Sequence, residues 1–162
     1  MRDLSHVDEH GKAQMVDVGE KPDTMREARA RGTVVMQPGT LALIQRNALQ
    51  KGDVLAVAKV AGIMAAKRTS ELIPLCHPLP LTSVDLTFGF EAGAGRIEIE
   101  SVARVTGKTG VEMEALTAVA AAALTVYDMC KAVDREMRIT DIRLIEKRGG
   151  RSGLFRRSGE GS

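Results

Sequence analysis

Aromatic side chains are scarce in this chain of 162 residues, which holds no Trp, one Tyr and three Phe. Its hydrophobic fraction of 44% and its charged fraction of 27% are nevertheless ordinary for a globular protein. The core must therefore be built from Ala, Val, Leu, Ile and Met, each of which buries less area than an aromatic ring. Such a core predicts further burial between copies of the chain, and a single domain accounts for the length.

Long apolar runs and cysteines are scarce as well. No stretch approaches the roughly 18 apolar residues of a membrane span, and the N-terminal residues are polar rather than signal-like. Cys76 and Cys130 are too few to form a disulfide framework. We therefore expect a reduced, cytoplasmic protein without a membrane partner.

Charge of one sign is also lacking, because the net charge is only +2. A value this small does not indicate a nucleic-acid partner. Positive charge is concentrated at the end of the chain, where the last 16 residues hold five cations and one carboxylate, Glu160. The glycines among these cations favour a mobile arm that closes on an anion, and the alternative is a solvated tail.

Hydrophobic alternation, caps and breakers predict the regular elements. Their order is strand, two helices, a β-hairpin, a helix and a strand, at residues 26–36, 40–50, 53–67, 83–91, 96–106, 110–133 and 137–146. Thr40 and Asp53 are expected N-caps of two helices that pack as a hairpin, and 13–18 is a candidate edge strand. This order predicts an α+β domain, a ferredoxin-like plait with helices on one face of an antiparallel sheet, over residues 1–155. A disordered tail is expected at 156–162.

The segment 72–81 contains three prolines and can form neither a helix nor an ordinary strand. It carries His77, which is the only histidine outside the first ten residues. A rigid apolar loop aims an imidazole and tunes its proton affinity, as catalysis requires. The alternative is a core histidine bonded to the backbone.

The long helix at 110–133 offers carboxylates at both ends. Asp128 and Lys131 are three residues apart and can touch, as a surface ion pair or as part of a site. Thr109 and Glu112 have the spacing of a capping box, whereas Glu114 has no such structural role beyond the helix dipole. Glu114 and Asp128 lie about 21 Å apart at 1.5 Å per residue, so both can serve one pocket only where two subunits meet.

Two other kinds of site are disfavoured. The segment at 107–109 resembles the end of a phosphate-binding P-loop, but Val102 stands where the first glycine is required. A polyphosphate could instead be held by scattered cations. A zinc site is disfavoured because Cys76 and His77 are adjacent and lack chelating spacing with Cys130.

Four segments read LSHVD at 4–8, KRTSELIPLCHPL at 67–79, TGVEMEAL at 109–116 and LTVYDMCK at 124–131. Together they resemble the cyclic pyranopterin monophosphate synthase family of molybdenum cofactor biosynthesis. The likeness extends over residues 4–155. It implies a ferredoxin-like subunit in a homohexamer, a trimer of dimers with sites between subunits.

The implied reaction is that of a lyase on a small-molecule nucleotide. Its substrate would be (8S)-3′,8-cyclo-7,8-dihydroguanosine 5′-triphosphate, and its products cyclic pyranopterin monophosphate and pyrophosphate. No tightly bound cofactor is implied, and Mg²⁺ assists in such enzymes.

Carried over residue by residue, the resemblance gives catalytic roles to Asp128, Lys51 and Lys131, with His77 positioning the ring or relaying a proton. The expected substrate contacts are Leu75, Cys76, His77, Glu112, Met113, Glu114, Arg26, Lys67 and Lys147. Two alternatives stay open: a nucleic-acid-binding plait, for which Phe88 and Phe90 would be the stacking residues, and a purely structural oligomer.

Overall fold

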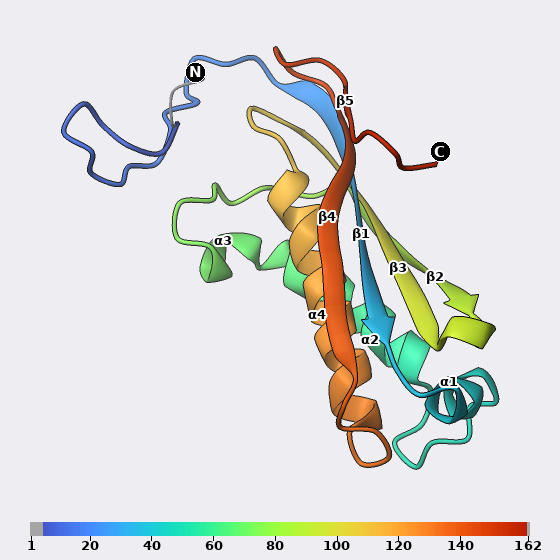
Figure 1. Cartoon of the computed structure of the whole chain (residues 1–162). Helices are drawn as coiled ribbons and strands as arrows, with labels where there is room; N and C mark the ends of the chain where they lie inside the picture. Colours follow the sequence, from blue (N-terminus) through green and yellow to red (C-terminus); the bar gives the residue numbers. More distant parts are fainter. Residues whose placement is uncertain (1–4, 162) are drawn as a thin grey trace.

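The computed structural model describes residues 5–161 and shows one five-stranded antiparallel sheet with helices on one side (Figure 1). The strand order is β2-β3-β1-β4-β5, with bounds β1 Thr24–Val35, β2 Ser83–Glu91, β3 Arg96–Gly107, β4 Arg138–Arg148 and β5 Phe155–Arg156. The helices are α1 Pro38–Gln45, α2 Val54–Lys67, α3 Thr69–Leu72 and α4 Glu112–Cys130, and a short 3-10 turn, η1 Ala92–Ala94, joins β2 to β3. The predicted α+β class and the ferredoxin-like plait are confirmed.

Alternation along β1 separates the two faces of the sheet. Ala28, Ala30 and Val34 are buried against the helices, whereas Arg29 and Arg31 point to the opposite face. β1 pairs with β3 and β4 on its two sides. It is therefore the central strand of the three that α4 covers, and its buried positions are small because the helix lies directly over them.

The helix α4 is the core of the molecule. Nine of its 19 residues are buried, mostly alanines and valines. By length and composition α4 is apolar enough to cross a membrane. In this fold it packs on β1, β3, β4 and α2, and half of its most apolar stretch is buried. Small side chains allow this close packing, which is how a chain with so few aromatics fills its interior.

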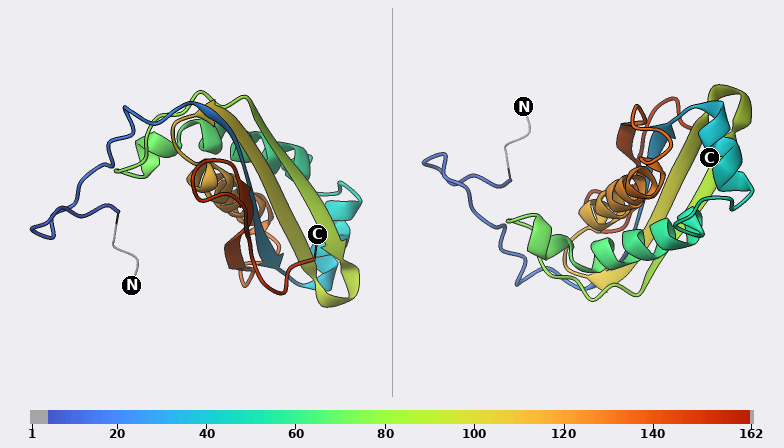
Figure 2. Two further views of the ribbon diagram at one scale, coloured as in Figure 1. Left: turned by 90° about the horizontal axis from the view of Figure 1, so that it is seen from above. Right: turned by 90° about the horizontal axis from the view of Figure 1, so that it is seen from below.

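The helix α2 lies beside α4 on the same side of the sheet (Figure 2). Gly62 makes the contact possible, because a Cβ there would lie 2.6 Å from Leu86 Cδ2 and 2.9 Å from the Ala118 carbonyl oxygen. α1 packs instead against η1. The predicted hairpin of the first two helices is therefore wrong, because α2 packs on α4 and β2 instead.

Local caps are right in one case and wrong in two. Asp53 caps α2 by accepting a hydrogen bond from the Ala56 amide at 3.0 Å, as predicted. Thr40 lies inside α1, and its hydroxyl donates to Asp134 at 3.1 Å. The predicted capping box is absent, since α4 begins at Glu112, and the Glu112 carboxylate pairs with Lys147.

Two other segments differ from expectation. Residues 13–18 form no strand beyond a single bridge between Val7 and Ala13. The segment expected to be a disordered tail begins with Arg156 of β5, and Glu160 bonds to arginines on the sheet. Leu4 of the first family segment and Ser162 of the tail lie outside the described residues.

Candidate active site

A cluster of two lysines and a carboxylate occupies the C-terminal end of α4. Lys131 Nζ lies 2.6 Å from Asp128 Oδ1. Lys51, from the loop before α2, donates to the Asp128 carbonyl oxygen at 2.9 Å and lies 3.4 Å from Oδ2. The structure thus brings together Asp128, Lys51 and Lys131, three of the four residues predicted to be catalytic, whereas His77 lies in a hollow at the other end of α4. Only the Asp128–Lys131 contact follows from helical spacing.

The side chains of this cluster are about half exposed. Hydrogen bonds from Lys131 and then Lys51, with the positive charge of both, hold the pKa of Asp128 below its usual range. Asp128 therefore stays ionised near neutral pH and keeps two ammonium groups side by side. Two proton donors on one carboxylate are a useful arrangement for successive proton transfers.

A second cluster surrounds a hollow of about 280 Å³ at the N-terminal end of α4. Its walls include most of the predicted substrate contacts, namely Leu75, Cys76, His77, Glu112, Met113 and Glu114. His77 Nε2 lies 2.7 Å from the carbonyl oxygen of Val16. In the neutral ring this bond places the proton on Nε2 and leaves Nδ1 as the nitrogen that can accept one.

Glu114 is the most unusual group in this hollow. It is only 4% exposed, and its Oε2 has no hydrogen-bond partner among the described residues. Burial, together with the nearby negative charge of Glu112, raises its pKa to about 7. Glu114 can therefore donate or accept a proton at neutral pH, whereas burial raises the pKa of the Cys76 thiol and keeps it protonated.

A third feature is a hollow of about 630 Å³ lined by cations. Its charged residues are Lys21, Arg26, Lys108, Lys147 and Arg151, against the single carboxylate Glu112. Thr109, Gly110 and Glu112 also line the His77 hollow, so the two hollows share a wall. The arrangement suits a ligand with a neutral ring system at one end and several phosphates at the other.

Backbone contacts hold Arg26 in this cationic hollow. Its guanidinium donates to the carbonyl oxygens of Gly107 at 3.0 Å and Lys108 at 3.2 Å. Gly150 lies directly against it with a φ of +74°, and a Cβ at this position would collide with Arg26. The glycine-rich segment predicted as a mobile arm is therefore a turn packed on one of the hollow's own cations.

One predicted contact is not brought to either hollow. Lys67 is exposed at the end of α2 and is not among the residues that line the hollows described. Conversely, Lys21 and His6 line the hollows although the sequence reasoning gave them no role. His6 falls in the family segment 4–8, which was the only available signal; nothing local marks Lys21.

Within one chain, the candidate site residues form two groups at opposite ends of α4. Glu114 and Asp128 sit in the first and last turns of the same straight helix, about 21 Å apart at 1.5 Å per residue (Figure 1). The Lys51–Asp128–Lys131 cluster and the paired hollows therefore cannot meet around one small molecule unless a second copy contributes one of them.

An α+β plait that joins buried acid–base groups to a cationic hollow defines an enzyme-like domain for a phosphorylated small molecule. The comparisons with known proteins identify its relatives. The family model described as MoaC family matches residues 15–150. The chain belongs to the MoaC family.

Three curated relatives are each named cyclic pyranopterin monophosphate synthase. The protein from Pelotomaculum thermopropionicum is 61% identical over 99% of this chain and 94% of its own length. The Chloroflexus aggregans protein is 64% identical over 95% of this chain and 93% of its own. The Roseiflexus protein is 61% identical over 96% of this chain and 98% of its own.

Proposed function

We propose that this chain converts (8S)-3′,8-cyclo-7,8-dihydroguanosine 5′-triphosphate into cyclic pyranopterin monophosphate with release of pyrophosphate. It is a lyase of molybdenum cofactor biosynthesis, as the names of its 61–64% identical relatives support. The structural observation that carries the proposal is the shared wall at Glu112. It joins a hollow with a protonatable carboxylate to a hollow with five cations.

The cationic hollow is the proposed site of the triphosphate. The reaction closes a cyclic phosphate when a sugar hydroxyl attacks the α-phosphate and pyrophosphate departs. Negative charge grows on the leaving group, and the proposed role of Arg26 and Lys147, which line this hollow, is to stabilise it. Lys147 is held at this wall by its ion pair with Glu112 at 2.7 Å.

The ring chemistry needs several proton transfers, for which the chain offers groups of different acidity. Glu114, with a pKa of about 7, can act as acid or base beside His77 in the ring hollow. Lys51 and Lys131 are the proposed acid and base around Asp128. Asp128, which stays ionised, holds both lysines in place and lies 2.6 Å from Lys131 Nζ.

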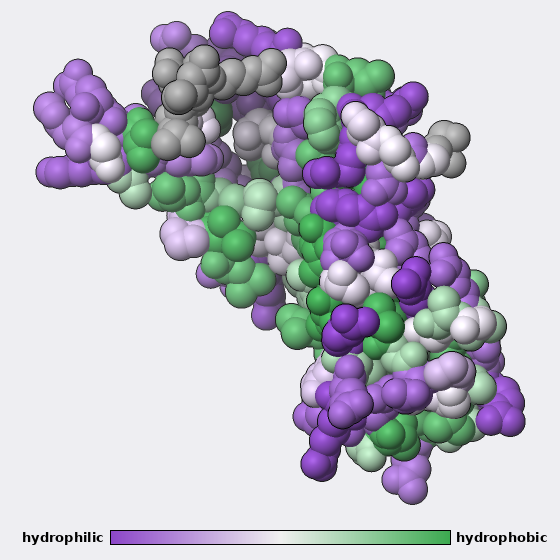
Figure 3. Space-filling view, in the orientation of Figure 1, coloured by the Kyte–Doolittle hydropathy of each residue, from purple (hydrophilic) through white to green (hydrophobic). Residues whose placement is uncertain are grey.

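We further propose that the complete site forms between two copies of the chain, within a homohexamer arranged as a trimer of dimers. The helical side of the molecule supports an interface there. Val57, Val60 and Met64 of α2 and Leu124 of α4 are 45–61% exposed. Figure 3 shows apolar surface along this side. Packing two such faces antiparallel would bury this surface and bring the start of one α4 toward the end of another.

Subunit complementation tests this arrangement. Asp128→Ala and Glu114→Ala proteins are each expected to lose activity, and mixing them under conditions that exchange subunits should restore part of it. Activity is measured as pyrophosphate released from the cyclic nucleotide. Hybrids as inactive as their parents would contradict the shared site, whereas an Asp128→Ala protein that turns over at the parent rate would contradict the role of Asp128.

A resident metal does not fit the described side chains. They contain no group of three or more His, Cys, Asp or Glu residues placed to hold an ion. Mg²⁺ assistance is therefore proposed through the substrate, whose phosphate oxygens are the hard ligands that this ion prefers. No step above depends on the ion.

The alternative of a nucleic-acid-binding plait is not favoured. Phe88 packs partly against the core, and only Phe90 is well exposed on β2. The other exposed Phe, Phe155, lies on β5 at the opposite edge of the sheet, so the two rings offer no common platform for successive bases. A cytoplasmic location belongs to the proposal, since the reaction is one of biosynthesis on a nucleotide.

A further inference from the structure

The C-terminal segment lines the cationic hollow with its turn and then returns along β4. After a turn at residues 149–153, β5 pairs with Glu146 and Lys147, and Lys147 itself lines the hollow. The Arg157 amide donates to the Ile145 carbonyl oxygen at 2.8 Å, and the Arg157 side chain to that of Leu144 at 2.7 Å. The segment thus follows β4 residue by residue toward the outer face of the sheet.

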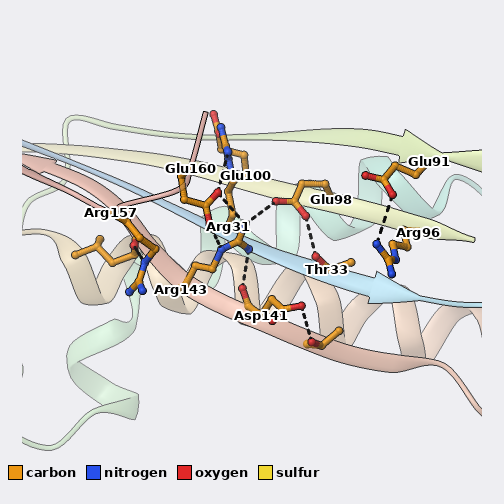
Figure 4. A network of polar contacts seen from close by, with 12 residues as sticks. Arg31, Thr33, Glu91, Arg96, Glu98, Glu100, Asp141, Arg143, Arg157 and Glu160 are labelled. Atoms are coloured by element: carbon orange, nitrogen blue, oxygen red, sulfur yellow. Dashed lines mark hydrogen bonds and ion pairs between the residues drawn. The ribbon is translucent and has the colours of Figure 1, made fainter. Parts of the chain in front are cut away.

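The segment is fastened at Glu160 (Figure 4). The Glu160 carboxylate accepts from Arg143 Nη2 at 3.0 Å and from Arg31 Nη1 at 3.3 Å. Its side chain is only 16% exposed. Glu98 and Glu100 hold the same two arginines from β3, so the fastening point is part of a fixed charge network on the sheet.

The other end of this segment carries a functional group. Arg151 lies in the turn at 149–153 and lines the cationic hollow together with Ser152. Gly149, Gly150 and Gly153 all have positive φ. Glycine adopts many backbone conformations, so the sequence of the turn does not by itself fix this one. The position of Arg151 therefore depends on what holds the chain on both sides of the turn.

We propose that Glu160 is a positioning residue for the phosphate site: by fastening the C-terminal segment to Arg31 and Arg143, it holds the turn at 149–153 so that Arg151 faces the cationic hollow. The inference rests on the proposed function, in which this hollow receives a polyphosphate. Glu160 acts only through Arg151 and does not touch the ligand. It is nine residues from Arg151 along the chain, on the opposite face of the sheet from α4.

Binding of inorganic tripolyphosphate to the full-length protein, measured by calorimetry at low salt, tests the inference. Arg151→Gln removes a charged contact and should raise Kd about tenfold. Glu160→Gln should raise Kd severalfold, and Glu160→Asp should recover most of the loss because it keeps the charge. The matched control is Glu91→Gln, which breaks an exposed pair with Arg96 at the η1 end of the sheet and should leave Kd unchanged.

A double-mutant cycle separates positioning from general loosening. If Glu160 acts through Arg151, then Glu160→Gln adds no further loss to Arg151→Gln. In turnover, Glu160→Gln should raise KM for the nucleotide and leave kcat within about twofold. Additive losses, or a Glu160→Gln protein that binds like its parent, would overturn the inference alone. A parent that binds no tripolyphosphate would overturn the polyphosphate assignment and the inference with it.

Discussion

Replacing Glu114 by Gln should stabilise the protein in alkaline solution and leave its stability almost unchanged in acid. The substitution keeps the shape of the side chain and removes its charge. Glu114 is 4% exposed and Oε2 has no partner among the described residues, so the ionised form is strongly disfavoured there. The protonated form fits the same space without a penalty for charge.

The magnitude follows from the pKa. A rise from 4.5 to about 7 corresponds to about 3 kcal/mol. Below pH 4.5 the carboxyl is protonated in both the folded and the unfolded chain. Burial of Glu114 therefore carries no charge penalty there, and the free energy of unfolding is at its highest. Between pH 4.5 and 7 only the unfolded chain loses the proton, so the free energy of unfolding falls as pH rises. The fall ends once the folded chain has also lost the proton, above about pH 7. The free energy of unfolding of the parent, relative to Glu114→Gln, should thus fall by about 3 kcal/mol.

The assay is urea unfolding of parent and variant from pH 4.5 to 8.5 at fixed protein concentration. Taking the difference between them cancels the titrating groups that do not interact with Glu114 and any constant effect of the amide. Glu91→Gln, at an exposed carboxylate, serves as the control and should show no comparable trend. A difference between parent and Glu114→Gln that stays constant across this range would refute the burial argument. Activity should fall in the same variant, because the amide exchanges no proton.

Four further substitutions have definite expected outcomes. Gly62→Ala should lower the free energy of unfolding by about 1–2 kcal/mol in urea titrations, because the new methyl group collides with Leu86. Asp134→Ala should lower the free energy of unfolding by about 1–3 kcal/mol in the same assay, because the Gln37 and Glu136 amides and the Thr40 hydroxyl lose their acceptor. Thr40→Ala should lower it less, because it removes only one of these donors. Gly150→Ala should weaken tripolyphosphate binding severalfold in calorimetry, with the melting temperature of the protein as a check on folding.

Local sequence signals predicted the elements well where burial enforces a period. The alternation of Ala28, Ala30 and Val34 identifies the central strand because one face of it must meet a helix. Capping signals were less reliable, since a side chain from elsewhere can replace a local partner. Glu112 illustrates this: Lys147, from a strand 35 residues away, takes the carboxylate that the capping box would have used.

The candidate site divides in the same way. The contact between Asp128 and Lys131 follows from a spacing of three on a helix, and the structure confirms it. Lys51 joins them across 77 residues, which only the family resemblance could supply. The fastening of the tail depends on Glu160 reaching Arg31, 129 residues earlier, whereas the composition of the tail alone suggests disorder.

The position of Glu112 has a consequence for how specificity can change. The Glu112 carboxylate borders both the His77 hollow and the cationic hollow, and it also holds Lys147 in place. Under the proposed function, a substitution there would alter the surroundings of the heterocycle and of the leaving group at once. A variant redesigned to accept a different base would therefore also need changes that restore phosphate binding. A substitution at Glu112 alone would change the recognition of the base and the binding of the phosphates together.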